Sequence, residues 1–366
     1  MDRRQFLRTT VLAGAGVLCA PMINRGRFRL FADEGTEISA RAVELVGRSL
    51  VIDMLGLLTL DWNALWDWQS APKDFSENDL RRLRGSGVDV FHPAVEPNQP
   101  DAHASCLEWL GGWNRLLQGR PDAFVRIDTA ADLARAKALK KVGLLLGFQN
   151  SDHFRTAADV ALFHGLGQRV SQLTYNARNR IGSGCQAEKG GLTAFGAEVV
   201  AAMNRAGMAV DISHCGDRTS LETVAASRKP VLITHSNCRA LVAHPRCKPD
   251  EVIRKVAECG GVMGITIIPA FVRQGQSARL DDVLDHFSHV ARLVGIEHVG
   301  LGSDADIDAV DPRTRQVRPR YRVQGLRLAR RVFELTDGLL RRGFGDSAIE
   351  GVLGGNFQRA LTEIWG

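Results

Sequence analysis

The chain has 366 residues, of which 45% are hydrophobic and 24% are charged, a composition typical of a globular domain with one large core that excludes disorder as the main state. Its formal net charge of +6 is concentrated at the N-terminus, because residues 1–30 contain six arginines and a single acid. The rest of the chain is nearly neutral, so we expect no nucleic-acid partner.

The N-terminus has the pattern of an export signal. Arg3 and Arg4 precede Phe6, Leu7 and a modest apolar run rich in Ala and Gly, which is typical of a twin-arginine signal peptide. We therefore expect residues 1–32 to engage the twin-arginine export machinery and the protein to be periplasmic or secreted. Two alternatives stay open, namely lipidation at Cys19 and a cytoplasmic protein with a basic N-terminal extension.

The apolar run of this signal is too short for a comfortable membrane span. It extends from about residue 9 to residue 23, whereas a helix needs about 20 apolar residues to cross a bilayer. No other segment is long enough, so no stable membrane span is expected.

Eight short apolar runs follow, each separated from the next by a turn and a helical stretch. They cover residues 50–56, 87–95, 142–148, 169–174, 207–213, 230–234, 261–266 and 298–302. Amphipathic patterns between them, such as residues 192–207 and 280–296, predict helices. This alternation predicts an α/β fold of the (β/α)8 TIM-barrel class, with residues 33–366 forming one domain. A doubly wound open sheet is the alternative, although no GxGxxG motif follows the first strand to favour it.

Polar residues stand at the ends of these predicted strands. In a (β/α)8 barrel the C-terminal strand ends open onto one face, where the active site is assembled. Two histidines and an aspartate converging on that face suit a divalent metal ion such as Zn²⁺. A lone histidine at a strand end is more often a hydrogen-bonded structural residue, but two of them with an aspartate at equivalent positions favour the metal site. The polar residues at strand ends are Asp53, His92, Gln149, Asn150, Tyr175, Asn176, His214, His235 and Asp304.

Four segments of the second half carry a family pattern: GGLTAFGAEVVAAMNRAGMAVDISH, KPVLITHSNCRALVAHPRCKPDE, HVGLGSDADI and VLGGNFQRAL. In this order and spacing they resemble the membrane dipeptidase (renal dipeptidase) family, the M19 metallopeptidases of the amidohydrolase superfamily. The resemblance extends from about residue 45 to the end of the chain. It implies a (β/α)8 barrel that hydrolyses dipeptides, often with D-residues at the second position, using two zinc ions bridged by a glutamate.

The resemblance implies roles for individual residues. His214 and His235 match the two histidines that hold one of the zinc ions. Asp304 matches the aspartate that contacts the other zinc ion and handles protons, which makes it the candidate catalytic residue. Arg246 matches the substrate-binding arginine, whose planar fork suits a carboxylate or an oxyanion.

The first half of the chain departs from this pattern. The family has His-x-Asp at the end of the first strand, where this chain has Leu55 and Leu57, and Gln149 replaces the bridging glutamate. Leucine cannot bind zinc, and a neutral amide supplies no charge to offset the repulsion of two cations. Tyr175 replaces a substrate-contacting histidine and can still donate a hydrogen bond to an oxyanion. With its neighbour Asn176 we expect it to bind substrate.

These losses favour one zinc ion rather than two. His214 and His235 would hold it, and Asp304, Gln149 or a water would complete the site. Hydrolysis remains possible, because a catalytic zinc needs only three protein ligands and an open position.

Other interpretations stay open. Asp53 or His92 is a candidate to replace the lost ligands. With or without such a replacement, we expect an exported metal-dependent hydrolase of a dipeptide or a related small amide. Alternatively, it is a metal-poor descendant that binds a small peptide or assists maturation of an exported metabolite. Since members of the family are often dimeric, the resemblance also implies a homodimer.

Overall fold

The computed structural model describes residues 27–28, 38–97, 100–275 and 277–366. Most of the predicted signal at residues 1–32 lies outside these ranges, so the signal stays a prediction, as does the assignment of residues 33–366 to one domain. Short strands β1 (Arg27–Phe28) and β2 (Ile38–Ser39) pair antiparallel ahead of the main sheet. Within the described ranges, no helix is long and apolar enough to cross a membrane.

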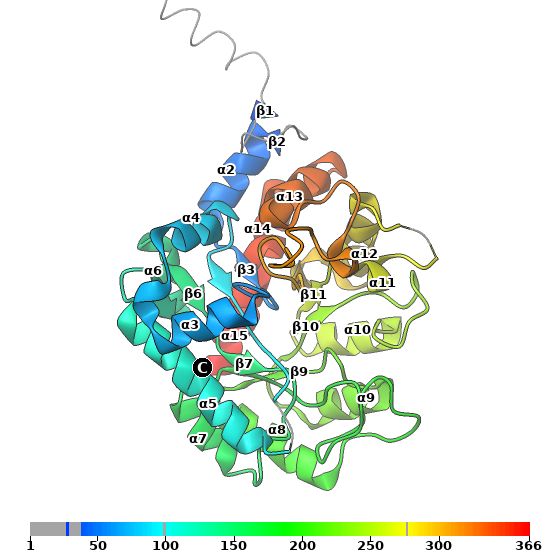
Figure 1. Cartoon of the computed structure of the whole chain (residues 1–366). Helices are drawn as coiled ribbons and strands as arrows, with labels where there is room; N and C mark the ends of the chain where they lie inside the picture. Colours follow the sequence, from blue (N-terminus) through cyan, green and yellow to red (C-terminus); the bar gives the residue numbers. More distant parts are fainter. Residues whose placement is uncertain (1–26, 29–37, 98–99, 276) are drawn as a thin grey trace, which may run out of the picture.

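The main sheet is parallel and curls round on itself, with the strand order β5-β6-β4-β3-β12-β11-β10-β9-β8-β7 (Figure 1). The ring closes at residues 142–148, because β6 pairs with β4 while β7 pairs with β8, and β5 adds a further strand beside β6. The predicted barrel is therefore confirmed. The strands are β3 (Ile52–Asp53), β4 (Val90–Phe91), β5 (Phe124–Arg126), β6 (Val142–Leu144), β7 (Gly147–Phe148), β8 (Val170–Gln172), β9 (Ala209–Asp211), β10 (Val231–Ser236), β11 (Met263–Ile265) and β12 (Val299–Leu301).

Each of the eight predicted apolar runs contains a strand of this ring, and the third run is divided into β6 and β7. Strand β5 was not predicted. It has only three residues and pairs with β6 at the outer end of the strand order. The apolar stretch around it covers only residues 123–125, between Asp122 and Arg126, which is shorter than the four to eight residues of a recognisable strand signal.

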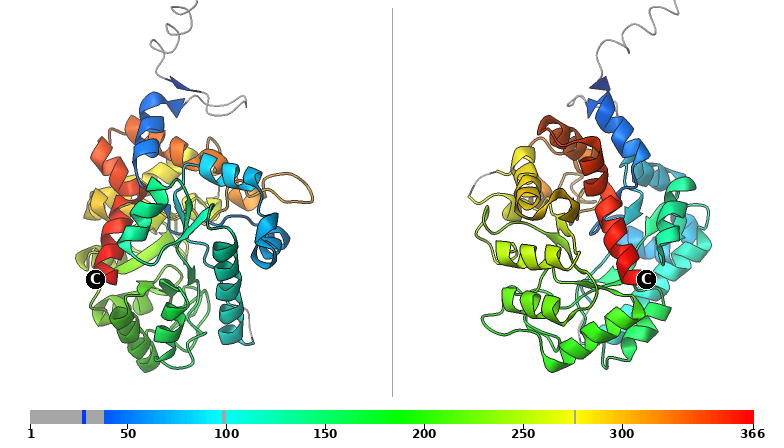
Figure 2. Two further views of the ribbon diagram at one scale, coloured as in Figure 1. Left: turned by 90° about the vertical axis from the view of Figure 1, so that its left-hand side faces the viewer. Right: turned by 180° about the vertical axis from the view of Figure 1, so that it is seen from behind.

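Helices form the outer layer around this sheet (Figures 1 and 2). The predicted helices at 192–207 and 280–296 correspond to α8 and α12. Helix α8 begins where the Thr193 hydroxyl accepts from the Gly196 amide, and it ends at Gly207 with φ +71°. The helices are α2 (Ala40–Arg48), α3 (Trp62–Ser70), α4 (Glu77–Gly85), α5 (Ala102–Gly119), α6 (Ala130–Ala138), α7 (Asp159–Gly165), α8 (Ala194–Ala206), α9 (Asp217–Ala226), α10 (Asp250–Glu258), α11 (Pro269–Val272), α12 (Leu280–Val294), α13 (Arg331–Arg341), α14 (Asp346–Glu350) and α15 (Asn356–Trp365).

The C-terminal helix α15 closes one end of the barrel. Its residues Phe357, Leu361 and Ile364 share a core cluster with Ile52 and Val90 at the starts of two strands. All five side chains are at most 1% exposed, and burial of each stabilises the fold by about 1.5–3 kcal/mol. With the N-terminal end of the barrel filled by apolar groups, the C-terminal strand ends are left to carry the polar site.

Candidate active site

Two of the predicted metal ligands meet at the C-terminal end of the barrel. His214 follows β9, His235 lies within β10, and their Nε2 atoms are 3.0 Å apart. Both residues are buried, at 5% and 0% exposure. Burial, and then the positive charge of Arg246, lower the pKa of each imidazole well below its usual range. Both rings are therefore neutral at pH 7, which is the form that binds a cation.

Hydrogen bonds on the far side of each ring determine which nitrogen carries the proton. Asn176 Oδ1 accepts from Nδ1 of His214 at 2.8 Å. The Thr234 hydroxyl donates to Asp211 Oδ2 at 2.7 Å, so its oxygen accepts from Nδ1 of His235 at 2.8 Å. The Nε2 lone pairs of both rings then point at one place, as they do in metal-ligating histidines whose other nitrogen donates to a neighbour.

Asp211 and Thr234 hold His235 in place through hydrogen bonds, and the sequence analysis did not predict this. The carboxylate of Asp211 also accepts from the Ser213 hydroxyl at 2.5 Å and from the Thr234 amide at 3.0 Å, which ties β9 to β10. The sequence did contain a signal for Asp211. It is an acidic residue inside the apolar run 207–213, and a buried charge is costly unless it has a partner.

Tyr175 and Asn176 lie against His214. The Tyr175 ring stacks on the imidazole with centroids 4.1 Å apart and planes inclined by 19°. Burial, and then the negative charge of Asp304, raise the pKa of the Tyr175 hydroxyl. Asn176 was predicted to bind substrate, but its amide oxygen is used by His214 and by the Sγ–H of Cys185, at 3.4 Å. In this arrangement Asn176 positions the imidazole.

Asp304 follows β12 and presents a free carboxylate. Its amide donates to the Leu55 carbonyl at 2.8 Å, and its φ of +59° lies in the left-handed region, which is strained for a residue other than glycine. No side chain of the described ranges forms a hydrogen bond or ion pair with this carboxylate. Burial raises its pKa to about 6, against the opposing charges of Arg246 and Arg320. A carboxylate of this kind is suited to accept a proton near neutral pH.

The full predicted ligand set is not brought together. Across the part of the chain that the structure describes, no three His, Cys, Asp or Glu side chains are close enough to hold a metal ion. In this structure Asp304 and the two histidines do not form such a group. Gln149 turns its amide nitrogen to the Ala94 carbonyl at 3.1 Å. Leu55 is 1% exposed and contributes only apolar surface.

Arg246 lies beneath the histidine pair and is 2% exposed. Its Nη1 donates to the Ser213 carbonyl at 2.6 Å and its Nη2 to the His235 carbonyl at 3.1 Å. Its Nε has no hydrogen-bond partner in the described part of the protein, and its guanidinium stands 5.4 Å from the centre of the Phe271 ring. One buried N–H is thus left for an anionic or oxyanionic group.

The two residues considered as replacement ligands are engaged elsewhere. Asp53 forms an ion pair with Arg331, with Oδ2 2.9 Å from Nη2 and both side chains fully buried. It also accepts from the Ser303 hydroxyl at 2.6 Å. His92 Nδ1 contacts the Leu145 carbonyl at 2.7 Å, and burial lowers its pKa. Asp53 is a structural residue in this fold, and the sequence analysis missed its partner Arg331.

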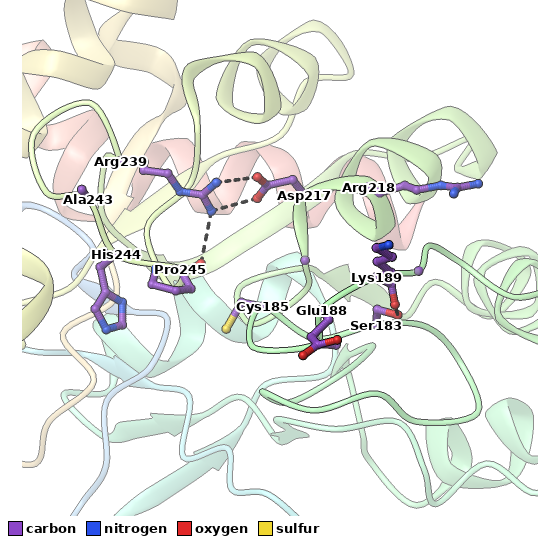
Figure 3. A pocket seen from close by; sticks show the side chains of 14 residues that line it. Ser183, Cys185, Glu188, Lys189, Asp217, Arg218, Arg239, Ala243, His244 and Pro245 are labelled. Atoms are coloured by element: carbon purple, nitrogen blue, oxygen red, sulfur yellow. Dashed lines mark hydrogen bonds and ion pairs between the residues drawn. The ribbon is translucent and has the colours of Figure 1, made fainter.

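A cavity of about 670 Å³ lies between the loops that follow β8, β9 and β10 (Figure 3), and it is lined by Gly216, two residues after His214, but by neither histidine of the pair. Cys185, Lys189, Arg239 and His244 are among the residues that line it. Its wall is joined to the site because the Cys185 amide donates to the His214 carbonyl at 2.7 Å. A cavity of this size accommodates a small peptide.

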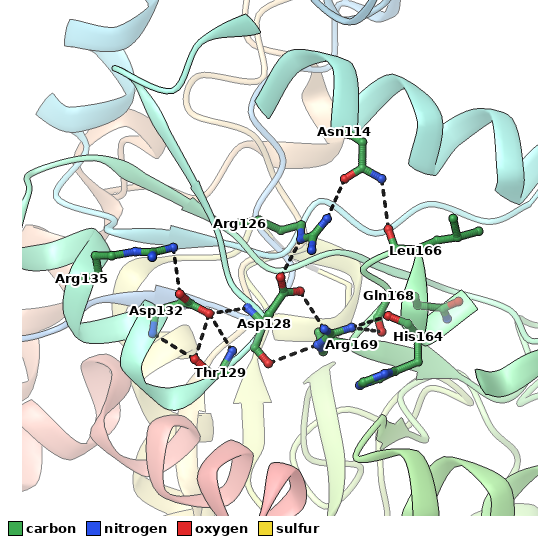
Figure 4. Close-up of polar contacts among 10 residues, drawn as sticks. All are labelled: Asn114, Arg126, Asp128, Thr129, Asp132, Arg135, His164, Leu166, Gln168 and Arg169. Carbon is green, nitrogen blue, oxygen red and sulfur yellow. Dashed lines mark hydrogen bonds and ion pairs between the residues drawn. The ribbon is translucent and has the colours of Figure 1, made fainter. Parts of the chain in front are cut away.

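A second polar cluster, shown in Figure 4, links β5 to the segment before β8. Asp128 pairs with Arg126 at 2.7 Å and with Arg169 at 2.9 Å, while Arg126 Nη1 donates to Asn114 Oδ1 at 3.0 Å. Arg169 Nη1 also donates to the His164 carbonyl at 2.7 Å. These paired charges anchor the additional strand β5, so we assign the cluster a structural role.

Known proteins are similar to this chain in sequence and architecture. The membrane dipeptidase family (Peptidase family M19) matches residues 39–365. Dipeptidase aclJ of Aspergillus oryzae is 32% identical over 308 residues, which are 79% of this chain and 70% of that protein. Dipeptidase 3 of Rattus norvegicus is 29% identical over 300 residues, 79% of this chain and 58% of that protein. A crystal structure of an amidohydrolase from Pseudomonas aeruginosa, 29% identical, matches 89% of this chain and 99% of its own with a TM-score of 0.76. The chain therefore belongs to the membrane dipeptidase family, peptidase family M19.

Proposed function

We propose that this dipeptidase-like hydrolase is exported and works with a single divalent metal ion, zinc in the first place, held by His214 and His235. The observation that carries the proposal is the pair of Nε2 atoms 3.0 Å apart, each on a ring whose Nδ1 is held by a hydrogen bond. Two lone pairs facing each other at this distance repel, and a cation between them removes the repulsion.

The residues present fit one ion and do not fit two. The side chains at the family's first-strand ligand positions are Leu55 and Leu57, and Gln149 stands in place of the bridging glutamate. None of these supplies the negative charge that a pair of divalent cations requires. When bound at the histidines, a zinc ion would lower the pKa of a water and polarise the substrate carbonyl.

The remaining chemistry is assigned to three side chains of this protein. Asp304 takes a proton from the attacking water and delivers it to the leaving amino group as the peptide bond breaks. The partnerless Nε–H of Arg246 and the Tyr175 hydroxyl donate to the carbonyl oxygen as it becomes negative, or to the substrate carboxylate. The adjoining cavity receives the rest of the dipeptide.

Metal content and a dipeptide panel test this function together. Protein purified without added zinc is expected to hold one ion per chain, which His214→Ala removes and Leu55→Ala leaves in place. Dipeptides with L- and D-residues at the second position are then assayed with zinc, manganese or cobalt, and with a chelator as control. Two ions per chain contradict the single-metal site, and hydrolysis that survives the chelator contradicts the metal mechanism.

A second candidate function is a metal-free homologue that binds a small peptide or assists maturation of an exported metabolite. It is favoured by the lack of a three-ligand group in the described ranges. Dipeptide binding without hydrolysis under any metal supports this function over the first.

Export is tested separately. Replacing Arg3 and Arg4 by lysines is expected to trap an unprocessed precursor in the cytoplasm, because the export receptor recognises the paired arginines. An unchanged periplasmic yield contradicts the twin-arginine assignment. The mass of the exported protein in solution tests the expected homodimer.

A further inference from the structure

His244 lines the cavity, in the segment that leads from β10 to Arg246 (Figure 3). Its Nδ1 accepts from the backbone amide of Arg246 at 3.0 Å, a bond to the second residue along the chain of the kind that side-chain acceptors form in turns. Burial, and then the positive charges of Arg246 and Arg239, lower the pKa of the imidazole. The ring is therefore neutral at pH 7, and its proton is on Nε2.

This proton is a free donor on the cavity wall. Within the described ranges, no group accepts a hydrogen bond from Nε2 of His244. Arg239, by contrast, is engaged by Asp217, with Nη2 2.9 Å from Oδ1. Lys189 also lacks an ion-pair partner in the described protein, but it is exposed, and no contact joins its side chain to the histidine pair or to Arg246.

His244 is joined to the site through Arg246 and a shared aromatic ring. The centre of the Phe271 ring lies 4.8 Å from the centre of the His244 ring and 5.4 Å from the Arg246 guanidinium. Arg246 in turn donates to the His235 carbonyl at 3.1 Å. Since both side chains lie against one ring, they are close enough for one dipeptide to contact both.

A dipeptide carries two acceptors that match such a pair of donors. Only the nitrogen and Cα separate its scissile carbonyl carbon from its carboxylate carbon, so ordinary bond lengths keep these carbons within about 4 Å of each other. When Arg246 or Tyr175 holds the carbonyl oxygen, the carboxylate must therefore lie nearby. His244 is the cavity residue that has both a free donor and a direct hydrogen bond to Arg246.

We propose that His244 is a specificity residue whose Nε2–H binds the terminal carboxylate of the substrate. The inference rests on the proposed hydrolase function and decides between the two roles that this function leaves to Arg246 and Tyr175, which are then both assigned to the scissile carbonyl oxygen. The preferred substrates are peptides in which the residue after the scissile bond has a free carboxylate, because a charged acceptor forms the stronger hydrogen bond.

The test compares Ala–Ala with its C-terminal amide, which has nearly the same shape and lacks the negative charge. We expect kcat/KM of the metal-loaded enzyme to favour Ala–Ala by about tenfold, mainly through KM, which is the effect of one hydrogen bond to a charged acceptor. His244→Asn should abolish the preference, because the asparagine oxygen still accepts from the Arg246 amide whereas the donor on Nε2 is lost. His244→Gln should restore part of it, since the longer side chain carries an N–H to the place of Nε2.

His298→Asn is the matched control. His298 is half-buried like His244 and lies just before β12, at the end of the barrel that the red α15 closes in Figure 2. Its Nδ1 is bonded to the Gly261 carbonyl at 2.7 Å. Replacing it removes an imidazole from the opposite end of the barrel and should leave the preference for Ala–Ala unchanged.

Equal kcat/KM for Ala–Ala and its amide in the unaltered enzyme overturns the inference, and so does a His244→Asn variant that keeps the preference. A preference that Lys189→Gln removes and His244→Asn keeps would assign the carboxylate to Lys189 instead. A loss of equal size for both compounds in His244→Asn also overturns the inference, because His244 would then only maintain the turn.

If no dipeptide is hydrolysed, the proposed function fails while the inference is still decided by calorimetry with the same two compounds. Tighter binding of Ala–Ala that His244→Asn removes supports the inference, and equal binding of Ala–Ala and its amide rejects it.

Discussion

Replacing Asn176 by alanine tests whether the histidine pair is a metal site. The Asn176 amide oxygen accepts from Nδ1 of His214 at 2.8 Å and holds the proton on that nitrogen. Without it, the imidazole is free to carry the proton on Nε2, where it would occupy the lone pair that faces His235. We therefore expect zinc to bind more weakly although neither histidine has been altered.

The size of the effect follows from two contacts. Removing one partner of a buried hydrogen bond costs about 1–3 kcal/mol, and removing a group that orients a metal ligand typically weakens metal binding about 10- to 100-fold. The stacked Tyr175 ring, 4.1 Å from the imidazole, still holds the plane of His214. Since this constraint survives, we expect a loss of about tenfold, near the lower limit for such orienting groups.

The assay is the zinc dissociation constant of the metal-free protein, measured by competition with a chelating dye. Asn176→Asp is the matched control, because a carboxylate accepts the same proton and should restore binding. Thr234→Val should weaken binding in the same way through His235. Wild-type affinity in Asn176→Ala, combined with loss of zinc in His214→Ala, would refute the reasoning, because the hydrogen bond would then have no part in presenting the ligand.

Three further predictions concern catalysis and stability. Asp304→Asn should lower kcat by about 10²- to 10⁴-fold while dipeptide binding is retained; steady-state kinetics showing an unchanged kcat would exclude Asp304 as the base. Burial lowers the pKa of His286 to about 4, so between about pH 4 and pH 6.5 the unfolded chain binds a proton that the folded protein excludes. The free energy of unfolding should therefore decrease by up to about 3 kcal/mol as the pH falls from about 6.5 to about 4. Urea unfolding at pH 7 and 4.5 should show this fall, with a smaller fall in His286→Gln. Asp53→Asn should destabilise the fold by about 3–5 kcal/mol, because it leaves the buried charge of Arg331 uncompensated, yet leave zinc content unchanged; loss of zinc without loss of stability would make Asp53 a ligand.

The sequence was sufficient to predict the barrel, because apolar runs, turns and amphipathic stretches are local signals that act within a few residues. It was also sufficient to predict that His214 and His235 meet. Parallel strands bring their C-terminal ends to one face, so two residues at equivalent strand ends become neighbours once the fold is known. Strand β5 was missed because the apolar stretch around it, residues 123–125, is shorter than the runs that contain the other strands.

The tertiary structure alone decided what each polar side chain touches. Asn176 accepts a hydrogen bond from Nδ1 of His214, the nitrogen that points away from His235. The Asp304 carboxylate forms no three-ligand group with the two histidines. Asp53 is paired with Arg331, which lies 278 positions further along the chain. A local pattern specifies that a buried polar group needs a partner but not which distant residue supplies it, because that choice depends on how strands and helices remote in sequence are packed together.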